Sequence, residues 1–301
     1  MGSGVDGGTG GEGRESVIAR AGVYLESIRF QHTIFALPFA FAAMLLAADG
    51  WPGWRVVILI TLAMAGARTG AMAANRLIDA ELDARNPRTE TRALPAGAMR
   101  RWEMLALGAG GVVLLGLAAW GLNSTALALA PVAAVLVSAY PYFKRFTWLS
   151  HWFLGLADAI AVAGAWIGVV AGLDTAAVLL TLAMMFWIAG FDVIYACQDL
   201  DVDRREGLHS VPARFGIGPA LWFSRGSHLV AVGCMVGLGV VAELSPIYWV
   251  GVATAAALLV YEAGMVRADD LNRLQQAFFD MNGYVSMAFM ASVILHFIIG
   301  V

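Results

Sequence analysis

The sequence is poor in charged residues. Aspartate, glutamate, lysine and arginine make up 14% of its 301 residues, whereas about 25% is usual for a soluble domain. Apolar residues make up 60% even when glycine is left out, and a single soluble core cannot bury so large a share. The composition therefore excludes an ordinary soluble protein and indicates an integral membrane protein.

Lysine and cysteine are also scarce. Lys144 is the single lysine beside 18 arginines, and the net charge is −3. A nucleic-acid-binding surface needs a clustered basic excess, so no nucleic acid partner is expected. The two cysteines, Cys197 and Cys234, lie in or beside apolar runs and have no CxxC spacing. The sequence therefore supports neither a disulfide framework nor a zinc site.

Long apolar runs are what the sequence has instead. A membrane-spanning helix needs roughly 17–25 residues, and nine runs reach or nearly reach that length. They cover residues 33–48, 56–74, 103–122, 125–140, 151–172, 176–197, 219–241, 247–265 and 281–300. The predicted fold class is an all-α integral membrane protein, a bundle of nine transmembrane helices. We expect the Gly-rich residues 1–16 to be a disordered tail and residues 17–301 to form one transmembrane domain.

Basic residues are concentrated on one side of this predicted bundle. Seventeen of the 19 lysines and arginines precede the first predicted helix, lie in the stretches that follow the second, fourth, sixth and eighth, or, in the case of Arg225, lie near the start of the seventh. An excess of lysine and arginine marks the cytoplasmic face, so the N-terminus is predicted to be cytoplasmic and the C-terminus to lie on the opposite side. The connections after the second and sixth helices are predicted to form a polar cap on the cytoplasmic face.

Polar residues recur at helical spacing at the cytoplasmic ends of the second and sixth predicted helices. These two stripes consist of Asn75, Asp79 and Asp83, and of Asp192, Tyr195, Asp199 and Asp203. Side chains three or four residues apart share one face of a helix, where neighbouring carboxylates repel each other unless a cation lies between them. Oxygen ligands without histidine or cysteine favour Mg2+, which completes its shell with water and phosphate oxygens. The stripes therefore predict a Mg2+ site for a phosphorylated substrate.

Basic side chains that suit phosphate flank the two stripes. They are Arg88, Arg92, Lys144, Arg145, Arg204 and Arg205. Any one charge in a loop is most simply explained by solvation, but two helix-spaced acidic stripes on equivalent helix ends are not. Carboxylates and arginines at the mouth of an apolar bundle suggest a substrate with a diphosphate head and a lipid tail.

These motifs resemble those of the UbiA family of intramembrane prenyltransferases, namely N-x3-D-x3-D at residues 75–83 and D-x3-D at residues 199–203. The strings RTETRALPAG at 88–97 and YPYFKRFTWL at 140–149 resemble it too. Within the family the sequence is similar to the 4-hydroxybenzoate polyprenyltransferase type, and residues 195–216 resemble the subgroup of the futalosine route to menaquinone. The resemblance runs from about residue 20 to the C-terminus. Two departures are Ala93, where many members have proline, and Arg29-Phe-Gln-His32, where Lys-Pro usually follows the arginine.

The resemblance implies a prenyltransferase of the bacterial inner membrane that transfers a polyprenyl group from polyprenyl diphosphate to an aromatic hydroxy acid. The acceptor would be 4-hydroxybenzoate or a dihydroxynaphthoate, in ubiquinone or menaquinone biosynthesis. The implied Mg2+ ligands are Asn75, Asp79, Asp83, Asp199 and Asp203, whose four aspartates are the predicted catalytic residues. The predicted substrate-binding residues are Asn75, Arg29, Arg68, Arg88, Arg92, Lys144, Arg145, Asp158, Asp192, Tyr195 and Arg205. A haem or lipid acceptor, and a non-enzymatic lipid-binding or transport bundle, are the alternatives.

Several polar residues leave alternatives open. Asp158 lies near the middle of the fifth predicted helix, where a charge costs roughly 2.5–3.5 kcal/mol, so it is either functional or hydrogen-bonded to a neighbouring helix. Arg68 either holds the carboxylate of the acceptor, together with Arg29 and Asn75, or pairs with Asp158. The five histidines lack metal-ligand spacing and are expected to pack at interfaces. His209, in the second polar connection, is the exception to test.

Overall fold

The computed structural model describes residues 22, 33–268, 270–271, 273–274 and 280–299. Within these ranges the regular structure is helical, apart from an isolated bridge between Arg267 and Asp270. The predicted tail, Arg29 and His32 lie outside the described residues.

Eight helices in the described part of the chain are long and apolar enough to span a membrane. They are α3 (Trp54–Arg85), α4 (Arg101–Leu122), α5 (Ser124–Phe143), α6 (Ser150–Val170), α7 (Thr175–Ala196), α10 (Ile217–Val241), α11 (Pro246–Met265) and α13 (Asn282–Ile299). The first predicted span corresponds to the shorter apolar helix α2 (Thr33–Ala47), of which 15 residues are described. The all-α membrane fold is therefore confirmed, with helices of spanning length at eight of the nine predicted positions.

Polar residues at the helix ends set several of these boundaries. The side chain of Asn123 accepts a hydrogen bond from the backbone nitrogen of Ala126 at 2.8 Å and caps α5. Asp174 caps α7 in the same way, through the backbone nitrogen of Ala177 at 2.8 Å. Helix α3 is longer than its apolar run predicts, because residues 75–85 are mostly good helix formers and continue it to Arg85.

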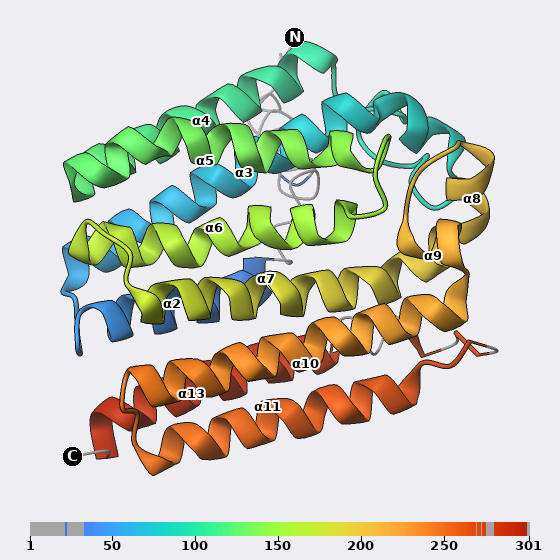
Figure 1. Ribbon diagram of the computed structural model, residues 1–301. Helices are drawn as coiled ribbons and strands as arrows, with labels where there is room; N and C mark the ends of the chain where they lie inside the picture. The colour runs from blue at the N-terminus through green and yellow to red at the C-terminus, as the bar shows by residue number, and fades with distance from the viewer. Residues whose placement is uncertain (1–21, 23–32, 269, 272, 275–279, 300–301) are drawn as a thin grey trace, which may run out of the picture.

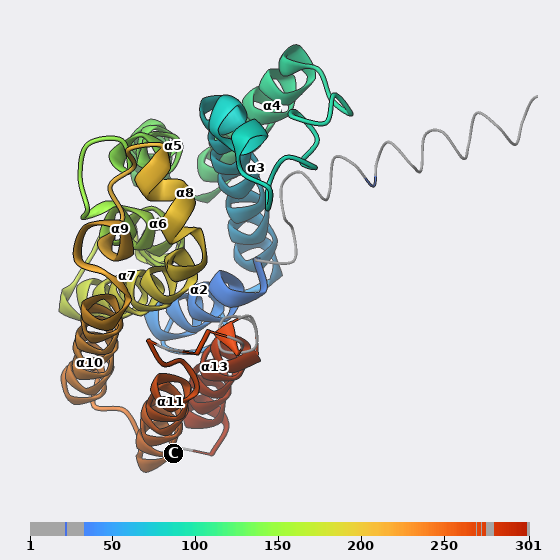
Figure 2. The same cartoon turned by 90° about the vertical axis from the view of Figure 1, so that its right-hand side faces the viewer.

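The helices run side by side, and their connections alternate between two ends of the bundle (Figure 1). One end has short turns. The other end has residues 86–100, which follow α3, and residues 197–216, which contain the short helices η2 (Cys197–Asp199), α8 (Leu200–Arg205) and α9 (Val211–Phe215). We call these two segments the polar cap. Viewed from the cap end, α2 lies inside the arc of the other long helices (Figure 2) and packs against α6 and α13.

Aromatic stacking and close backbone contacts hold the bundle together. Phe39 of α2 stacks on Phe289 of α13 and on Trp187 of α7, with ring centroids 4.6 and 4.9 Å apart. Where α6 crosses α7, Gly155 brings the backbones so close that a Cβ at this position would collide with the carbonyl oxygen of Met185. Small residues permit such contacts between membrane helices, where burial from water contributes little to association.

Candidate active site

The first stripe lies on the part of α3 that continues beyond its apolar segment. Asn75, Asp79 and Asp83 follow one another at four-residue intervals, and all three line a polar cavity of about 240 Å3. The carboxylates of Asp79 and Asp83 are buried. Asn75 donates from Nδ2 to the hydroxyl oxygen of Tyr140 at 2.6 Å. The structure thus brings these side chains together as their spacing predicts.

The second stripe differs from the continuous helix that its spacing predicts. Helix α7 ends at Ala196, residues 197–199 form the tighter turn η2, and α8 follows. A 3-10 turn has about three residues per turn instead of 3.6, so it changes the direction of the side chains that follow. The stripe still converges on the polar cavity, which is lined by Asp192, Tyr195, Asp199 and Asp203.

Two basic residues from the connection between α5 and α6 neutralise Asp79. Lys144 Nζ lies 2.5 Å from Asp79 Oδ2, and Arg145 Nη2 lies 3.5 Å from Asp79 Oδ1. Arg145 also donates to the carbonyl oxygen of Ile78 at 2.7 Å. Lys144 lines the polar cavity, whereas Arg145 is anchored on the backbone of α3 beside it.

Asp83 is held by its own helix and by the first cap segment. Arg92 Nη1 donates to Asp83 Oδ1 at 2.6 Å, and Thr89 Oγ1 donates to the Asp83 carbonyl oxygen at 3.0 Å. Arg76, which is buried on α3, lies 3.8 Å from Asp83 Oδ2. Arg76 was not among the predicted site residues, and its spacing of seven from Asp83, about two helical turns, is the sequence signal for this contact.

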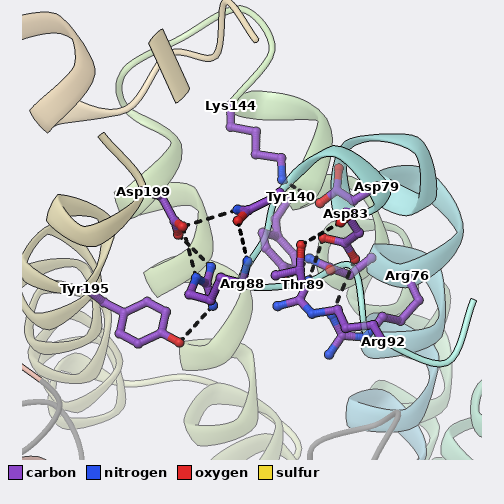
Figure 3. A network of polar contacts seen from close by, with 12 residues as sticks. Arg76, Asp79, Asp83, Arg88, Thr89, Arg92, Tyr140, Lys144, Tyr195 and Asp199 are labelled. Carbon is purple, nitrogen blue, oxygen red and sulfur yellow. Dashed lines mark hydrogen bonds and ion pairs between the residues drawn. The ribbon is translucent and has the colours of Figure 1, made fainter. Parts of the chain in front are cut away.

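Arg88 connects the first cap segment to the second stripe (Figure 3). Its Nε and Nη2 atoms donate to the two carboxylate oxygens of Asp199 at 2.9 and 2.6 Å, and Nη1 donates to the Tyr195 hydroxyl at 3.1 Å. Burial lowers the pKa of the Arg88 guanidinium, but the hydrogen bonds and charge of Asp199 outweigh burial and raise that pKa above its ordinary value. Arg88 therefore stays cationic in the cavity.

The remaining carboxylates of the second stripe have partners other than lysine and arginine. Ser210 Oγ donates to Asp203 Oδ2 at 2.6 Å. Asp192 Oδ2 lies 2.7 Å from Nδ1 of the buried His151, whose Nε2 accepts a hydrogen bond from the backbone nitrogen of Val211 at 3.1 Å. The prediction that His151 is a packing residue was wrong, since both of its ring nitrogens bind polar groups and it lines the cavity. No sequence spacing links it to Asp192.

A second cavity of about 260 Å3 is lined mainly by apolar residues of α3, α4, α5 and α6. Arg68 and Asp158 are its charged residues, and their side chains lie 3.7 Å apart. The alternative in which Arg68 pairs with Asp158 is therefore confirmed. Tyr140 lines both cavities, so the polar and apolar spaces adjoin there.

Two other predicted residues lie away from the cavity. Arg205 is exposed, donates to the carbonyl oxygen of Arg85 at 3.0 Å and lies 3.5 Å from Glu206. Because its guanidinium binds these two groups on the outside of the polar cap, Arg205 does not lie with the other predicted substrate-binding residues. His209 acts through its backbone, whose nitrogen donates to the carbonyl oxygen of Lys144 at 2.7 Å.

The donor set fits a hard cation that binds together with its ligand. Among the residues that the structure describes, no three histidine, cysteine, aspartate or glutamate side chains converge as a preformed metal site. The stripes face each other across the cavity with basic side chains between them (Figure 3). Asp83 Oδ2 is buried and accepts no hydrogen bond from any described residue. Carboxylates with such spare acceptor capacity suit Mg2+ that shares its shell with phosphate oxygens.

Comparisons with known proteins agree with this geometry. The model of the UbiA prenyltransferase family matches residues 36–293. A 4-hydroxybenzoate octaprenyltransferase from Marinobacter nauticus is 32% identical over 270 residues, which cover 88% of this chain and 92% of that protein. The apo structure of a UbiA homolog from Aeropyrum pernix K1 has a TM-score of 0.80 and 32% identity, and the match covers 88% of this chain and 98% of that one.

A second solved structure shares the fold at lower identity. It is a UbiA homolog from Archaeoglobus fulgidus bound to DMAPP and Mg2+, with a TM-score of 0.69 and 18% identity over 92% of this chain and 99% of that one. The family match includes both acidic stripes and the segments that carry Arg88 and Lys144. The resemblance found in the motifs is thereby confirmed, as are prenyltransferase activity and an integral membrane location. By its motifs, its helical fold and these matches, the chain belongs to the UbiA prenyltransferase family.

Proposed function

We propose that the protein transfers a polyprenyl group from polyprenyl diphosphate to an aromatic hydroxy acid and releases diphosphate. The acceptor is 4-hydroxybenzoate or a dihydroxynaphthoate, so the product serves ubiquinone or menaquinone biosynthesis. One observation carries the proposal: two acidic stripes meet in a polar cavity that adjoins an apolar cavity at Tyr140. The name of the Marinobacter nauticus relative supports an aromatic acceptor.

The diphosphate head is assigned to the polar cavity. Bound Mg2+ supplies Lewis-acid stabilisation of the charge that develops on the leaving diphosphate. The residues that would hold it are Asn75, Asp79, Asp83, Asp199 and Asp203. The Oδ2 atom of Asp83, which accepts no hydrogen bond from the described residues, and the Mg2+ bound in the Archaeoglobus fulgidus homolog support this assignment.

Basic residues of the polar cavity are assigned to the phosphate oxygens. Arg88, Arg92 and Lys144 line the cavity and each lies within 3 Å of a stripe carboxylate. Their cationic groups therefore already lie beside the carboxylates in the wall of the cavity that the diphosphate would occupy. Donors fixed in this way stabilise negative charge as the allylic C–O bond breaks, without having to reorganise. Arg145 supports Lys144 by sharing the charge of Asp79.

The prenyl tail and the acceptor ring are assigned to the apolar cavity. Its aliphatic lining keeps water away from an allylic cation, which water would otherwise capture. Arg68 Nε is buried and has no hydrogen-bond partner among the described residues. The Arg68 guanidinium therefore has a donor left for the acceptor's carboxylate while it pairs with Asp158.

The orientation in the membrane follows from the basic residues. The polar cap carries arginines on both of its segments, whereas the short turns at the opposite end carry Arg55 as their nearest basic residue. We therefore place the mouth of the polar cavity and the N-terminus on the cytoplasmic side of the bacterial plasma membrane.

Purified protein in detergent, supplied with polyprenyl diphosphate, Mg2+ and both acceptors in competition, tests the proposal. We expect a C-prenylated acid and one diphosphate per product, and we expect a metal chelator to stop the reaction. Asp79→Ala and Asp199→Ala should each abolish turnover. Asp174→Asn, which keeps the cap at the opposite end of α7, should not change it. Absence of product with both acceptors would contradict the proposed function, and activity in either alanine variant would contradict the metal assignment.

A further inference from the structure

Asp192 and Asp203 are the stripe carboxylates of the polar cavity that form no ion pair with lysine or arginine among the described residues, and Asp192 is the one of the two that is not an implied Mg2+ ligand. Asp79, Asp83 and Asp199 each pair with lysine or arginine. Asp192 contacts His151 instead, and 22% of its side chain is exposed in the cavity. Asp192 therefore reaches the cavity without a lysine or arginine competing for its carboxylate.

The hydrogen bonds of His151 indicate which ring nitrogen carries the proton. The backbone N–H of Val211 donates to Nε2, so this nitrogen carries a lone pair and the ring proton sits on Nδ1. Nδ1 then donates to Asp192 Oδ2 at 2.7 Å. The Nδ1–H group of the buried ring thus orients Asp192 through a hydrogen bond.

Asp192 also lies at the appropriate depth. It precedes Tyr195 by about one helical turn and Asp199 by about two on the chain that enters the polar cap, so it lies nearer the membrane interior than the D-x3-D motif. Tyr140, which lines the same cavity, also lines the apolar one. Asp192 and Tyr140 therefore line one cavity, and Tyr140 is shared with the cavity assigned to the acceptor ring.

We propose that Asp192 is the base that removes the ring proton during prenyl transfer, and that His151 is its positioning residue. The inference rests on the proposed function. The allylic C–O bond breaks and its electron pair leaves with diphosphate, while an electron pair of the ring forms the new C–C bond. The ring C–H bond then returns its electrons to the aromatic system and passes its proton to Asp192. Solvent in the polar cavity takes the proton from Asp192 afterwards.

Ring deuteration tests the role of Asp192. We compare unsubstituted protein and Asp192→Asn, using the accepted aromatic acid with either hydrogen or deuterium at the carbon that receives the prenyl group. Product formation should fall about 10²–10⁴-fold, the usual contribution of a positioned base. The KM for polyprenyl diphosphate should change little, and a primary isotope effect should appear that unsubstituted protein lacks. An unchanged rate, or a slower rate without an isotope effect, would overturn the proposal.

Two isosteric variants test His151 as a positioning residue. His151→Asn keeps a donor near Nδ1, and His151→Gln keeps an acceptor near Nε2. If the role of the ring is to hold Asp192, kcat should fall less in His151→Asn than in His151→Gln, with similar KM values for polyprenyl diphosphate. The opposite order, or equal losses, would contradict it.

The proposed function and this inference fail differently. If unsubstituted protein prenylates neither acceptor, the proposed function fails. If it prenylates one and Asp192→Asn does so equally well, only the inference about the base fails. Asp174→Asn serves as the control, because it makes the same chemical change at the far end of the same helix.

Discussion

The two acidic stripes differ in how their carboxylates are held. Those of the first stripe lie on one unbroken helix, where Asp83 pairs with Arg92 nine residues along the chain and Asp79 pairs with Lys144, 65 residues along. Those of the second stripe lie on an interrupted helix, and their partners Arg88, Ser210 and His151 come from three separate segments. The first stripe therefore has a continuous helix as its scaffold and the second does not, while both draw partners from distant parts of the chain.

The largest expected effect separates the stripes by stability. Asp83→Ala removes the carboxylate from between Arg92 and Arg76, and the Arg76 side chain is 5% exposed. Breaking a buried ion pair costs about 3–5 kcal/mol. Asp199→Ala leaves Arg88, which is 31% exposed, free to turn toward water, and we expect a cost of about 1 kcal/mol or less. Thermal unfolding of both variants in one detergent measures the difference.

The losses of activity and of stability should not be proportional in Asp83→Ala and Asp199→Ala. Both variants lose a predicted Mg2+ ligand, so both should lose prenyl transfer although only one loses substantial stability. Unfolding midpoints that coincide would show that the two stripes are held equally, and the comparison would then be wrong.

An intermediate effect is expected for the arginines that serve each stripe. Arg88 forms a two-pronged contact with Asp199 and reaches Tyr195, which a lysine cannot reproduce. Arg88→Lys should raise the KM for polyprenyl diphosphate roughly tenfold, equivalent to about 1.4 kcal/mol. Arg92→Lys should raise it less, because Arg92 makes a single contact with Asp83. Steady-state kinetics with varied diphosphate compares them, and a larger effect of Arg92→Lys would reverse the interpretation.

The smallest effect is expected at the edge of the second stripe. Arg205 contacts the backbone of Arg85 and the side chain of Glu206 on the outside of the polar cap. Arg205→Ala should change the free energy of unfolding by less than about 0.5 kcal/mol and leave the KM for polyprenyl diphosphate unchanged. A marked rise in that KM would instead support the prediction from the sequence that Arg205 binds the substrate.

Properties that depend on local periodicity were predictable from the sequence. Apolar runs predicted the spans, and four-residue spacing predicted that Asp79 and Asp83 face one cavity. The same reasoning missed the 3-10 turn at 197–199, because an irregular turn leaves no periodic signal. It also kept two partners open for Arg68, since spacing along one helix does not show what lies on the next.

Contacts across the polar cap could not be predicted from the sequence, because their partners lie far apart along the chain. Arg88 and Asp199 are 111 residues apart, and His151 and Asp192 are 41 apart on different helices. Their meeting depends on how α3, α6 and α7 pack. Arg88 was still identified as a phosphate-binding candidate from its chemistry, whereas a histidine at the start of an apolar run resembles many that only pack.

Gly155 determines how closely α6 approaches α7, although it has no side chain of its own. It follows His151 by about one turn of α6, at the place where α6 touches the backbone of α7 around Met185. This contact sets the sliding position of one helix along the other, and with it the gap that the imidazole must bridge to reach Asp192. A methyl group added at residue 155 would touch no substrate. It would push α6 away from α7 and so lengthen the distance between His151 and Asp192.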